Sequence, residues 1–421
     1  MFEFLHAADL HLDTQPSGLH GYPEDVAEVL RDASLGAFEN LVQTAIDRGV
    51  AFCVFAGDIY DGAERGTRAE LAFRRGLVRL ADEGIRSYIV HGNHDPLEQG
   101  WSTISRWPGE VTVFGTGERG TQLCEIAGTT VAVHGVSYAR RDTTENLASR
   151  FQAHPDAEIQ IGVLHTNAGG NPEHAPYAPC SIDELRSSGF DYWALGHIHS
   201  RRTLAGPDPW IVYPGNTQGR HPGASEQGPK GAVVVGVGDD GTVREPEFVA
   251  LDVLRFARID VPVDDLADLG ALSDELDRRC NELRADNEGR ALVIRAHLTG
   301  RGPVHAQLAD PPTRSGAWES VREEWSGRTP VVWWDRFTDE TAGDLDLEEL
   351  EDQDDFAGNA LAAIRSLPRG EGDDLERELE RLRRLSPPLE RLGVPTPRRT
   401  DPELVGRARA LAAHLLTEEE R

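Results

Sequence analysis

The segment LGHIHSRR, residues 195–202, sets two histidines one residue apart and follows them with two arginines. Alternate side chains of a strand point to opposite faces, so at most one of His197 and His199 could lie in a core. Both can converge on one point if the strand ends here and the chain turns. Because histidine is a common metal ligand, the pair predicts a metal site with further ligands earlier in the chain.

Four other short motifs place metal-binding side chain types directly after apolar segments. They are DLH at 9–11, GDIYD at 57–61, GNHD at 92–95 and the histidine of GVLHTN at 165. Ligands of open α/β sheets bind beyond the carboxyl ends of the strands, so we expect the five motifs to meet at one edge. Alone, His165 could be a structural histidine at a strand end and Asp61 a loop cap. The ordered set of five favours one shared site.

The chemistry of these side chains suits two divalent ions. Carboxylate, amide oxygen and imidazole nitrogen together match Mn²⁺, Fe or Zn²⁺ better than a thiolate-preferring metal. A carboxylate has two oxygens and can bridge two ions, and ions about 3.5–4 Å apart can clamp the attacking and leaving oxygens of a phosphoryl displacement. Gly57, Gly92 and Gly196 beside the motifs permit tight turns. The sequence therefore predicts a two-metal phosphoesterase site.

The elements that must position these motifs alternate between strand and helix periodicity. We expect helices over 26–47 and 68–82, and strands over 3–8, 51–56, 86–91, 130–136, 158–165, 191–195, 210–213 and 231–237. This alternation is typical of a layered α/β domain. We assign residues 1–250 to it.

The pattern changes after residue 250. A strand over 255–261, a helix over 266–284 and a strand over 290–298 predict a small α+β domain spanning 251–340. Eight acids among residues 344–355 read best as a solvated linker, with a contact for a basic partner as the alternative. The rest of 341–421 carries leucine stripes typical of helices, which could pack on the chain itself or dock on a partner helix.

Bulk properties restrict the class of protein. The net charge is −29, so binding to nucleic acid would need local basic patches, bound cations or a partner. The four cysteines are scattered without a CxxC pair, which favours a cytoplasmic location. The N-terminus is too polar for a signal peptide, and no apolar run has the length of a membrane span.

Taken together, the five motifs resemble those of the calcineurin-like metallophosphoesterase superfamily. The segments ADLHLD, HAPYAPC, DYWALGHIH and YPGNTQGRH are similar to its DNA-repair exonuclease branch, the SbcD- and YhaO-type nuclease subunits. The resemblance implies a layered α/β/β/α sandwich, a small α+β capping domain and a helical C-terminal tail. It also implies Mn²⁺ as the usual metal, with Fe, Zn²⁺ or Mg²⁺ as alternatives. The partners it implies are an SMC-like coiled-coil ATPase of the SbcC/YhaN type and a second copy of the chain.

The resemblance also assigns roles to residues. One metal would be held by Asp9, His11, Asp58 and His199, and the other by Asp58, Asn93, His165 and His197, with Asp58 bridging. His94 would be the catalytic histidine that is not a ligand, and Asp61 would orient it.

Arginines around the motifs bear on the substrate. Arg140, Arg201, Arg202 and Arg220 follow predicted strand ends and could form a cationic collar for phosphates, although each could equally pair with the abundant acids. We therefore predict a metal-dependent exonuclease that acts at DNA ends in repair or recombination. The alternatives are a phosphoesterase for small molecules or phosphoproteins, and a mainly structural subunit that binds DNA ends or the ATPase.

Overall fold

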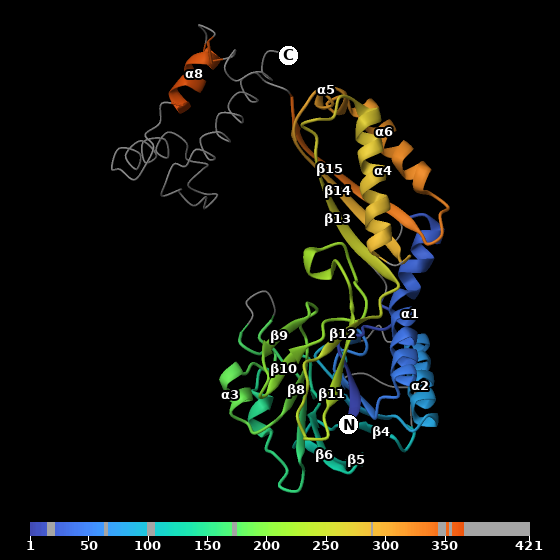
Figure 1. Cartoon of the computed structure of the whole chain (residues 1–421), viewed down its shortest axis with the longest axis vertical. Coiled ribbons are helices and arrows are strands. Elements are labelled where there is room, and N and C mark those ends of the chain that lie inside the picture. The colour runs from blue at the N-terminus through green and yellow to red at the C-terminus, as the bar shows by residue number, and fades with distance from the viewer. Residues whose placement is uncertain are drawn as a thin grey trace. The chain divides into compact units, whose positions relative to one another are not determined.

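The computed structural model describes residues 1–14, 22–62, 66–98, 106–170, 175–287, 289–343, 351–352 and 356–365. These form two compact units (Figure 1). The first comprises 1–259, 280–295 and 322–336, and the second comprises 260–279, 296–321 and the described residues from 337 onward. The predicted helices after residue 366 and most of the acidic run lie outside the described residues. The domain boundaries expected at 250 and 340 stay predictions.

The first sheet lies in the first unit and has the strand order β12-β11-β1-β2-β3-β4. Its strands are β1 (Phe2–Ala7), β2 (Phe52–Ala56), β3 (Arg86–Val90), β4 (Val111–Val113), β11 (Gly231–Val237) and β12 (Glu247–Ala250). Strands β1 to β4 run parallel, and β11 pairs antiparallel with β1. Helices α1 (Glu24–Arg48) and α2 (Thr67–Asp82) cover one face, where Phe38 and Leu77 pack on Leu5 and Phe55.

The second sheet has the order β5-β6-β7-β8-β10-β9. Its strands are β5 (Gly120–Ile126), β6 (Thr129–Val136), β7 (Ile159–His165), β8 (Tyr192–Gly196), β9 (Arg202–Ala205) and β10 (Trp210–Tyr213). Strands β6, β7, β8 and β10 run parallel. The two sheets share one core, in which Phe52 and Val54 of the first meet Val163 and Tyr192 of the second.

The outer face of the second sheet is also covered. Helix α3 (Ile182–Arg186) and the short helix η3 (Leu147–Arg150) pack there through Leu185 and Leu147 on Trp193. The layers are therefore helix, sheet, sheet and helix, which confirms the predicted α/β class and layered sandwich.

A third sheet has the order β13-β14-β15. Its strands are β13 (Leu254–Pro262), β14 (Ala291–Arg301) and β15 (Val332–Ala342), accompanied by α4 (Leu269–Asp286), α5 (His305–Leu308) and α6 (Pro311–Trp325). Helix α8 (Phe356–Arg365) follows. Sequence analysis missed β15 and α6. Polar residues occupy the exposed positions of β15, and α6 begins with two prolines, which a first helical turn tolerates but which read as a break. A search of the described residues finds no helix with both the length and the apolarity that crossing a membrane requires.

The five strands that precede the motifs end within one residue of where the sequence analysis places them. Each ends at, or within three residues of, a predicted ligand: β1 before Asp9, β2 before Asp58, β3 before Asn93, β7 at His165 and β8 before His197. Because β1–β3 are parallel neighbours and β7–β8 are parallel neighbours, the fold delivers the motifs from the carboxyl ends of two stacked sheets.

Candidate metal centre

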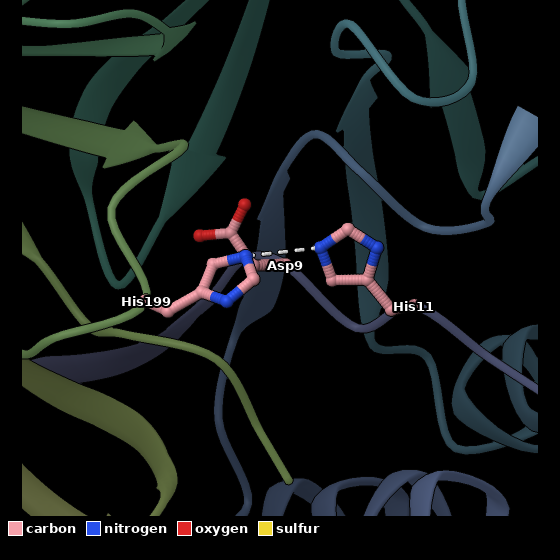
Figure 2. Close-up of side chains that lie close together, drawn as sticks. All are labelled: Asp9, His11 and His199. Carbon is pink, nitrogen blue, oxygen red and sulfur yellow. Dashed lines mark hydrogen bonds between the residues drawn. The ribbon is translucent and has the colours of Figure 1, made fainter. Parts of the chain in front are cut away.

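One group of potential ligands consists of Asp9, His11 and His199, with one donor atom from each lying within 4.8 Å of the others. Figure 2 shows the two imidazole rings facing each other beside the Asp9 side chain. The Nε2 atoms of His11 and His199 are 3.1 Å apart. Two imidazole nitrogens that each bind one ion at about 2.0–2.1 Å are separated by roughly 3 Å. The pair therefore has the spacing of two ligands of the same ion.

The outer nitrogens of these two histidines are held by carboxylates. His11 Nδ1 donates to Asp61 Oδ1 at 2.8 Å, and His199 Nδ1 donates to Glu226 Oε1 at 2.6 Å. A carboxylate at one ring nitrogen fixes the proton there and leaves the other nitrogen as a lone-pair donor. Two lone pairs would then face each other at 3.1 Å, an arrangement that a cation between them stabilises. The donor set therefore fits a divalent ion.

A second group consists of Asp9, Asp58 and His165. His165 Nε2 lies 3.3 Å from Asp58 Oδ2 and 2.9 Å from Asn93 Oδ1. Its Nδ1 donates to the carbonyl of Ala56 at 2.9 Å, so Nε2 is again the nitrogen left for a ligand. Asp58 Oδ2 also lies 3.9 Å from His11 Nε2. The Asp58 carboxylate therefore reaches both groups, as a bridging ligand must.

His197 occupies a different position from the other predicted ligands. Its ring lies beside that of His165, with 5.3 Å between the centroids, and its Nε2 is 3.3 Å from the carbonyl of Ala175. Its backbone N–H donates to both carboxylate oxygens of Asp9, at 3.0 and 3.1 Å. Three groups of three potential ligands occur among the described residues, the third being His11, Asp61 and His94, and none of them includes His197. The structure thus brings all seven predicted ligands to one edge, but their binding roles stay predictions.

Four of these residues adopt a left-handed backbone. The φ angles of Asp9, His11, Asp58 and His197 are 52°, 43°, 52° and 107°, in a region that costs free energy for residues with a Cβ. Backbone hydrogen bonds oppose this strain, because the N–H groups of Asp9 and His11 donate to the carbonyls of Gly57 and Asp58, both at 3.0 Å. The ligand loops after β1 and β2 therefore hold each other in shape.

The glycines beside the ligands are required by close approach. A Cβ on Gly92 would lie 2.3 Å from Asp58 Oδ1, and one on Gly196 would lie 1.9 Å from the Ala56 carbonyl oxygen. Gly57 has both constraints, with φ of 93° and a Cβ position 2.5 Å from His165 Nδ1. The predicted reason, a tight turn, applies to Gly57. At Gly92 and Gly196, which keep negative φ, the reason is space.

Asp61 contacts more partners than the sequence analysis expected. Its Oδ1 lies 2.7 Å from His94 Nδ1 as well as 2.8 Å from His11 Nδ1. Its Oδ2 accepts a hydrogen bond from Thr14 Oγ1 at 2.6 Å and forms an ion pair with the Arg220 guanidinium. Asp61 is therefore placed to orient both the predicted catalytic histidine and a predicted ligand.

These contacts control the protonation of Asp61 and His94. Burial opposes the charged form of Asp61, but its hydrogen bonds from His11 and His94 outweigh burial and hold its pKa well below the usual range. Burial also disfavours the imidazolium of His94, yet the hydrogen bond to Asp61 and the charges of Asp58 and Asp61 raise the pKa of His94. The His94 side chain is 32% exposed, so it combines a stabilised proton with access to solvent.

The predicted phosphate-binding arginines differ in their surroundings. Arg220 is already paired with Asp61, and Arg201 stacks over the Phe248 ring at 4.2 Å. Arg140 and Arg202 are exposed. Their contact with phosphate stays a prediction.

Sequence analysis missed one buried carboxylate of the site, Glu226, and assigned no role to another, Asp95 of the GNHD motif. Glu226, 2% exposed, contacts His199, and Asp95, fully buried, accepts hydrogen bonds from the N–H groups of Ile59 and Gly92 at 2.9 and 2.8 Å. Asp95 thereby joins the loops after β2 and β3. The rule that a ligating histidine needs a carboxylate or carbonyl behind it predicts a residue such as Glu226, but it does not say which acid supplies it.

Two family profiles match the chain. The calcineurin-like phosphoesterase profile matches residues 2–201, and the profile of the middle domain of metallophosphoesterase YhaO matches residues 256–342. The uncharacterized metallophosphoesterase YhaO of Bacillus subtilis (strain 168) is 34% identical over 379 residues, which cover 90% of each protein. The DNA double-strand break repair protein Mre11 of Halobacterium salinarum is 28% identical over 58% of each chain. Mre11 of Methanopyrus kandleri is 24% identical over 82% of this chain and 74% of its own. The chain belongs to the calcineurin-like metallophosphoesterase family.

Proposed function

We propose that this protein is a divalent-metal-dependent phosphodiesterase that degrades DNA from its ends during repair or recombination. The observation that carries the proposal is the facing pair His11 and His199 beside the group Asp9, Asp58 and His165. The similarity to DNA double-strand break repair proteins supports DNA as the substrate.

The predicted ligands divide into two sets in this proposal. Asp9, His11, Asp58 and His199 would hold one ion, and Asp58, Asn93, His165 and His197 the other. Bound divalent ions, with Mn²⁺ as the proposed metal, supply Lewis-acid activation of water and of the phosphate. The carboxylates behind the histidines and the hydrogen bonds between the ligand loops keep this set in place.

His94 is the proposed general acid. Its Nδ1 is hydrogen-bonded to Asp61, so Nε2 is the atom that can release a proton to the departing sugar oxygen. The raised pKa of His94 retains that proton to higher pH than an ordinary histidine would. Arg220 holds the other oxygen of Asp61, which makes Asp61 a fixed partner for His94.

The partners follow from charge and resemblance. A chain with a net charge of −29 repels a polyanion, so we propose that DNA ends are presented by an SMC-like coiled-coil ATPase in the cytoplasm. Exposed Arg140 and Arg202 would add local contacts to phosphate. We also propose that the chain works as a homodimer.

The test is cleavage of end-labelled linear duplex DNA by the purified full chain with Mn²⁺. Asp58→Asn should abolish it and His94→Asn should reduce it about 10²- to 10⁴-fold, whereas the controls outside the site, exposed Asp239→Asn and half-buried His154→Asn, should not. Bis-p-nitrophenyl phosphate and p-nitrophenyl phosphate, assayed in parallel, separate diester from monoester chemistry. A chain that hydrolyses only the monoester would contradict the nuclease proposal and support the alternative phosphoesterase. Inactivity on all three substrates, also when the cognate ATPase is added, would favour the structural role.

A further inference from the structure

Residues 214–230, the segment between β10 and β11, contact both sides of the metal centre. This segment contains Glu226, which contacts His199, and Arg220, which contacts Asp61. Asp61 in turn contacts His11 and His94. His199 and His11, whose Nε2 atoms face each other, are therefore each hydrogen-bonded to a carboxylate. Residues 214–230 supply the carboxylate for His199, and they bind the carboxylate of His11 through Arg220.

Glu226 uses both oxygens. Oε1 accepts from His199 Nδ1 at 2.6 Å, while Oε2 accepts from Asn216 Nδ2 at 2.7 Å and from the backbone N–H of Arg220 at 3.1 Å. The same carboxylate therefore shapes the turn that carries Arg220 and sets the orientation of His199. Its burial makes this contact strong, because a charged acceptor in a low-dielectric site binds its donors tightly.

Lys230 is the single lysine of a chain that otherwise uses only arginine as its fixed cation, and it is 5% exposed. Its Nζ donates to the carbonyls of His199 and Ser225, at 3.1 and 2.6 Å, and lies 3.9 Å from Glu226 Oε2. A compact ammonium fits this space, where three acceptors converge on one point, better than a planar guanidinium. Lys230 therefore ties the backbone of the histidine to the helical turn that carries Glu226.

The backbone at the start of residues 214–230 packs closely against the backbone of His199. Gly215 has φ of 80°, and a Cβ on it would lie 2.7 Å from the carbonyl oxygen of His199. Asn216 N–H donates to that same oxygen at 3.2 Å. The segment is thus packed directly against the residue that it orients.

We propose that Glu226 is a positioning residue for the metal ligand His199, and that with Lys230 it makes residues 214–230 a brace for the metal centre. Glu226 keeps the proton of His199 on Nδ1 and fixes the ring, so that Nε2 faces His11 ready to bind. The inference rests on the proposed metal centre but not on DNA being the substrate.

The test measures Mn²⁺ binding to the full chain by titration calorimetry, with no substrate present. Glu226→Gln should weaken Mn²⁺ affinity about 10- to 100-fold, as loss of a carboxylate behind a ligating histidine typically does. The matched control is Asp191→Asn, since the half-buried Asp191 carboxylate accepts a hydrogen bond from the backbone N–H of Gln160 at 2.7 Å, away from the predicted ligands and from residues 214–230. That control should lose stability but keep its Mn²⁺ affinity.

A second readout reports the tautomer of His199 directly. In ¹H–¹⁵N spectra of the metal-free chain, the His199 ring, assigned by comparison with His199→Gln, should carry its proton on Nδ1. Glu226→Ala should move it toward a mixture of tautomers. If the uncharged variants do not fold, Glu226→Asp keeps the charge for Lys230 but withdraws it from His199 by one methylene, and it should still weaken Mn²⁺ binding.

The outcomes distinguish a failure of the positioning role of Glu226 from a failure of the metal centre itself. Folded Glu226 variants that bind Mn²⁺ as the wild type does, with the Nδ1 tautomer retained, would overturn the positioning role and leave the metal centre intact. A wild-type chain that binds no Mn²⁺, Fe²⁺ or Zn²⁺ would overturn the metal centre and this inference with it.

Discussion

Gly92 offers a sharp test of how closely the ligands are packed. It lies between β3 and Asn93, and a Cβ added there would be 2.3 Å from Asp58 Oδ1 and 2.8 Å from the His165 ring. Its φ is not in the left-handed region, so alanine at this position adds bulk without backbone strain. We predict that Gly92→Ala damages the metal site through Asp58 and His165 together.

The magnitude follows from the distances. Real Cβ atoms essentially never approach another heavy atom closer than 3.0 Å, so the new Cβ and Asp58 Oδ1 must separate by at least 0.7 Å, the difference from 2.3 Å. That oxygen accepts the backbone N–H of His94 at 2.9 Å, so the movement disturbs a second loop. Overpacking of this kind costs about 1–3 kcal/mol. A misplacement of about 1 Å at a reacting centre can cost roughly 100-fold in rate.

The assay compares Gly92→Ala with Gly109→Ala, because a Cβ on Gly109 meets nothing within 4 Å. We expect Gly92→Ala to lower the melting temperature by several degrees, to weaken Mn²⁺ binding and to slow hydrolysis of bis-p-nitrophenyl phosphate about 100-fold. Gly109→Ala should resemble the wild type in all three measurements. A Gly92→Ala protein with wild-type Mn²⁺ affinity and rate would refute the proposed crowding of Asp58 and His165.

Three further predictions concern His94, Asp61 and His6. His94→Asn should reduce diester hydrolysis about 10²- to 10⁴-fold while leaving Mn²⁺ affinity unchanged, because His94 is a proton donor outside the ligand set; a parallel loss of Mn²⁺ binding would show instead that it is a ligand. Since the raised pKa of His94 keeps the ring protonated to higher pH, the alkaline limb of the rate profile should lie above the usual histidine range and fall as pH rises through that raised pKa. Asp61→Asn should shift this limb to lower pH, and an unmoved limb would contradict the assignment. Burial lowers the pKa of His6 to about 3, so protonation favours the unfolded chain, and stability should fall by about 1.4 kcal/mol per pH unit as pH drops below 6.5 toward 3. Urea unfolding at pH 7, 6 and 5 should show a shallower loss for His6→Gln than for the wild type, and equal losses would contradict this account.

The positions of the ligands could be predicted because they depend on a rule about strands. The apolar runs before Asp9, Asp58 and Asn93 form adjacent parallel strands, and parallel strands carry their following loops to the same edge. The runs before His165 and His197 do the same in the second sheet. Five short motifs therefore sufficed to place a site whose residues span almost two hundred positions.

Elements at the sheet edges were harder to predict, because an edge strand has fewer buried positions to reveal its periodicity. Strand β9 exposes two of its four residues and includes Arg202, which sequence analysis assigned to a phosphate-binding loop. Strand β15 alternates the exposed polar residues Arg336, Thr338 and Glu340 with half-buried ones, which weakens the apolar pattern. In both cases pairing with a neighbouring strand, which is a tertiary property, decides the structure.

The carboxylates behind the ligands were unpredictable for a related reason. Sequence analysis assigned Asp61 to His94 alone, yet one of its oxygens lies within 2.8 Å of both His94 and His11. Glu226 reaches His199 across 27 residues, and nothing in its local sequence distinguishes it from the other 71 acids of the chain. Ligand types follow from the chemistry of the ion, whereas the partners behind them depend on how loops from separate strands pack. The left-handed φ angles at four ligand positions could not be predicted for the same reason, because the hydrogen bonds between loops that offset their cost at Asp9 and His11 form only in the folded chain.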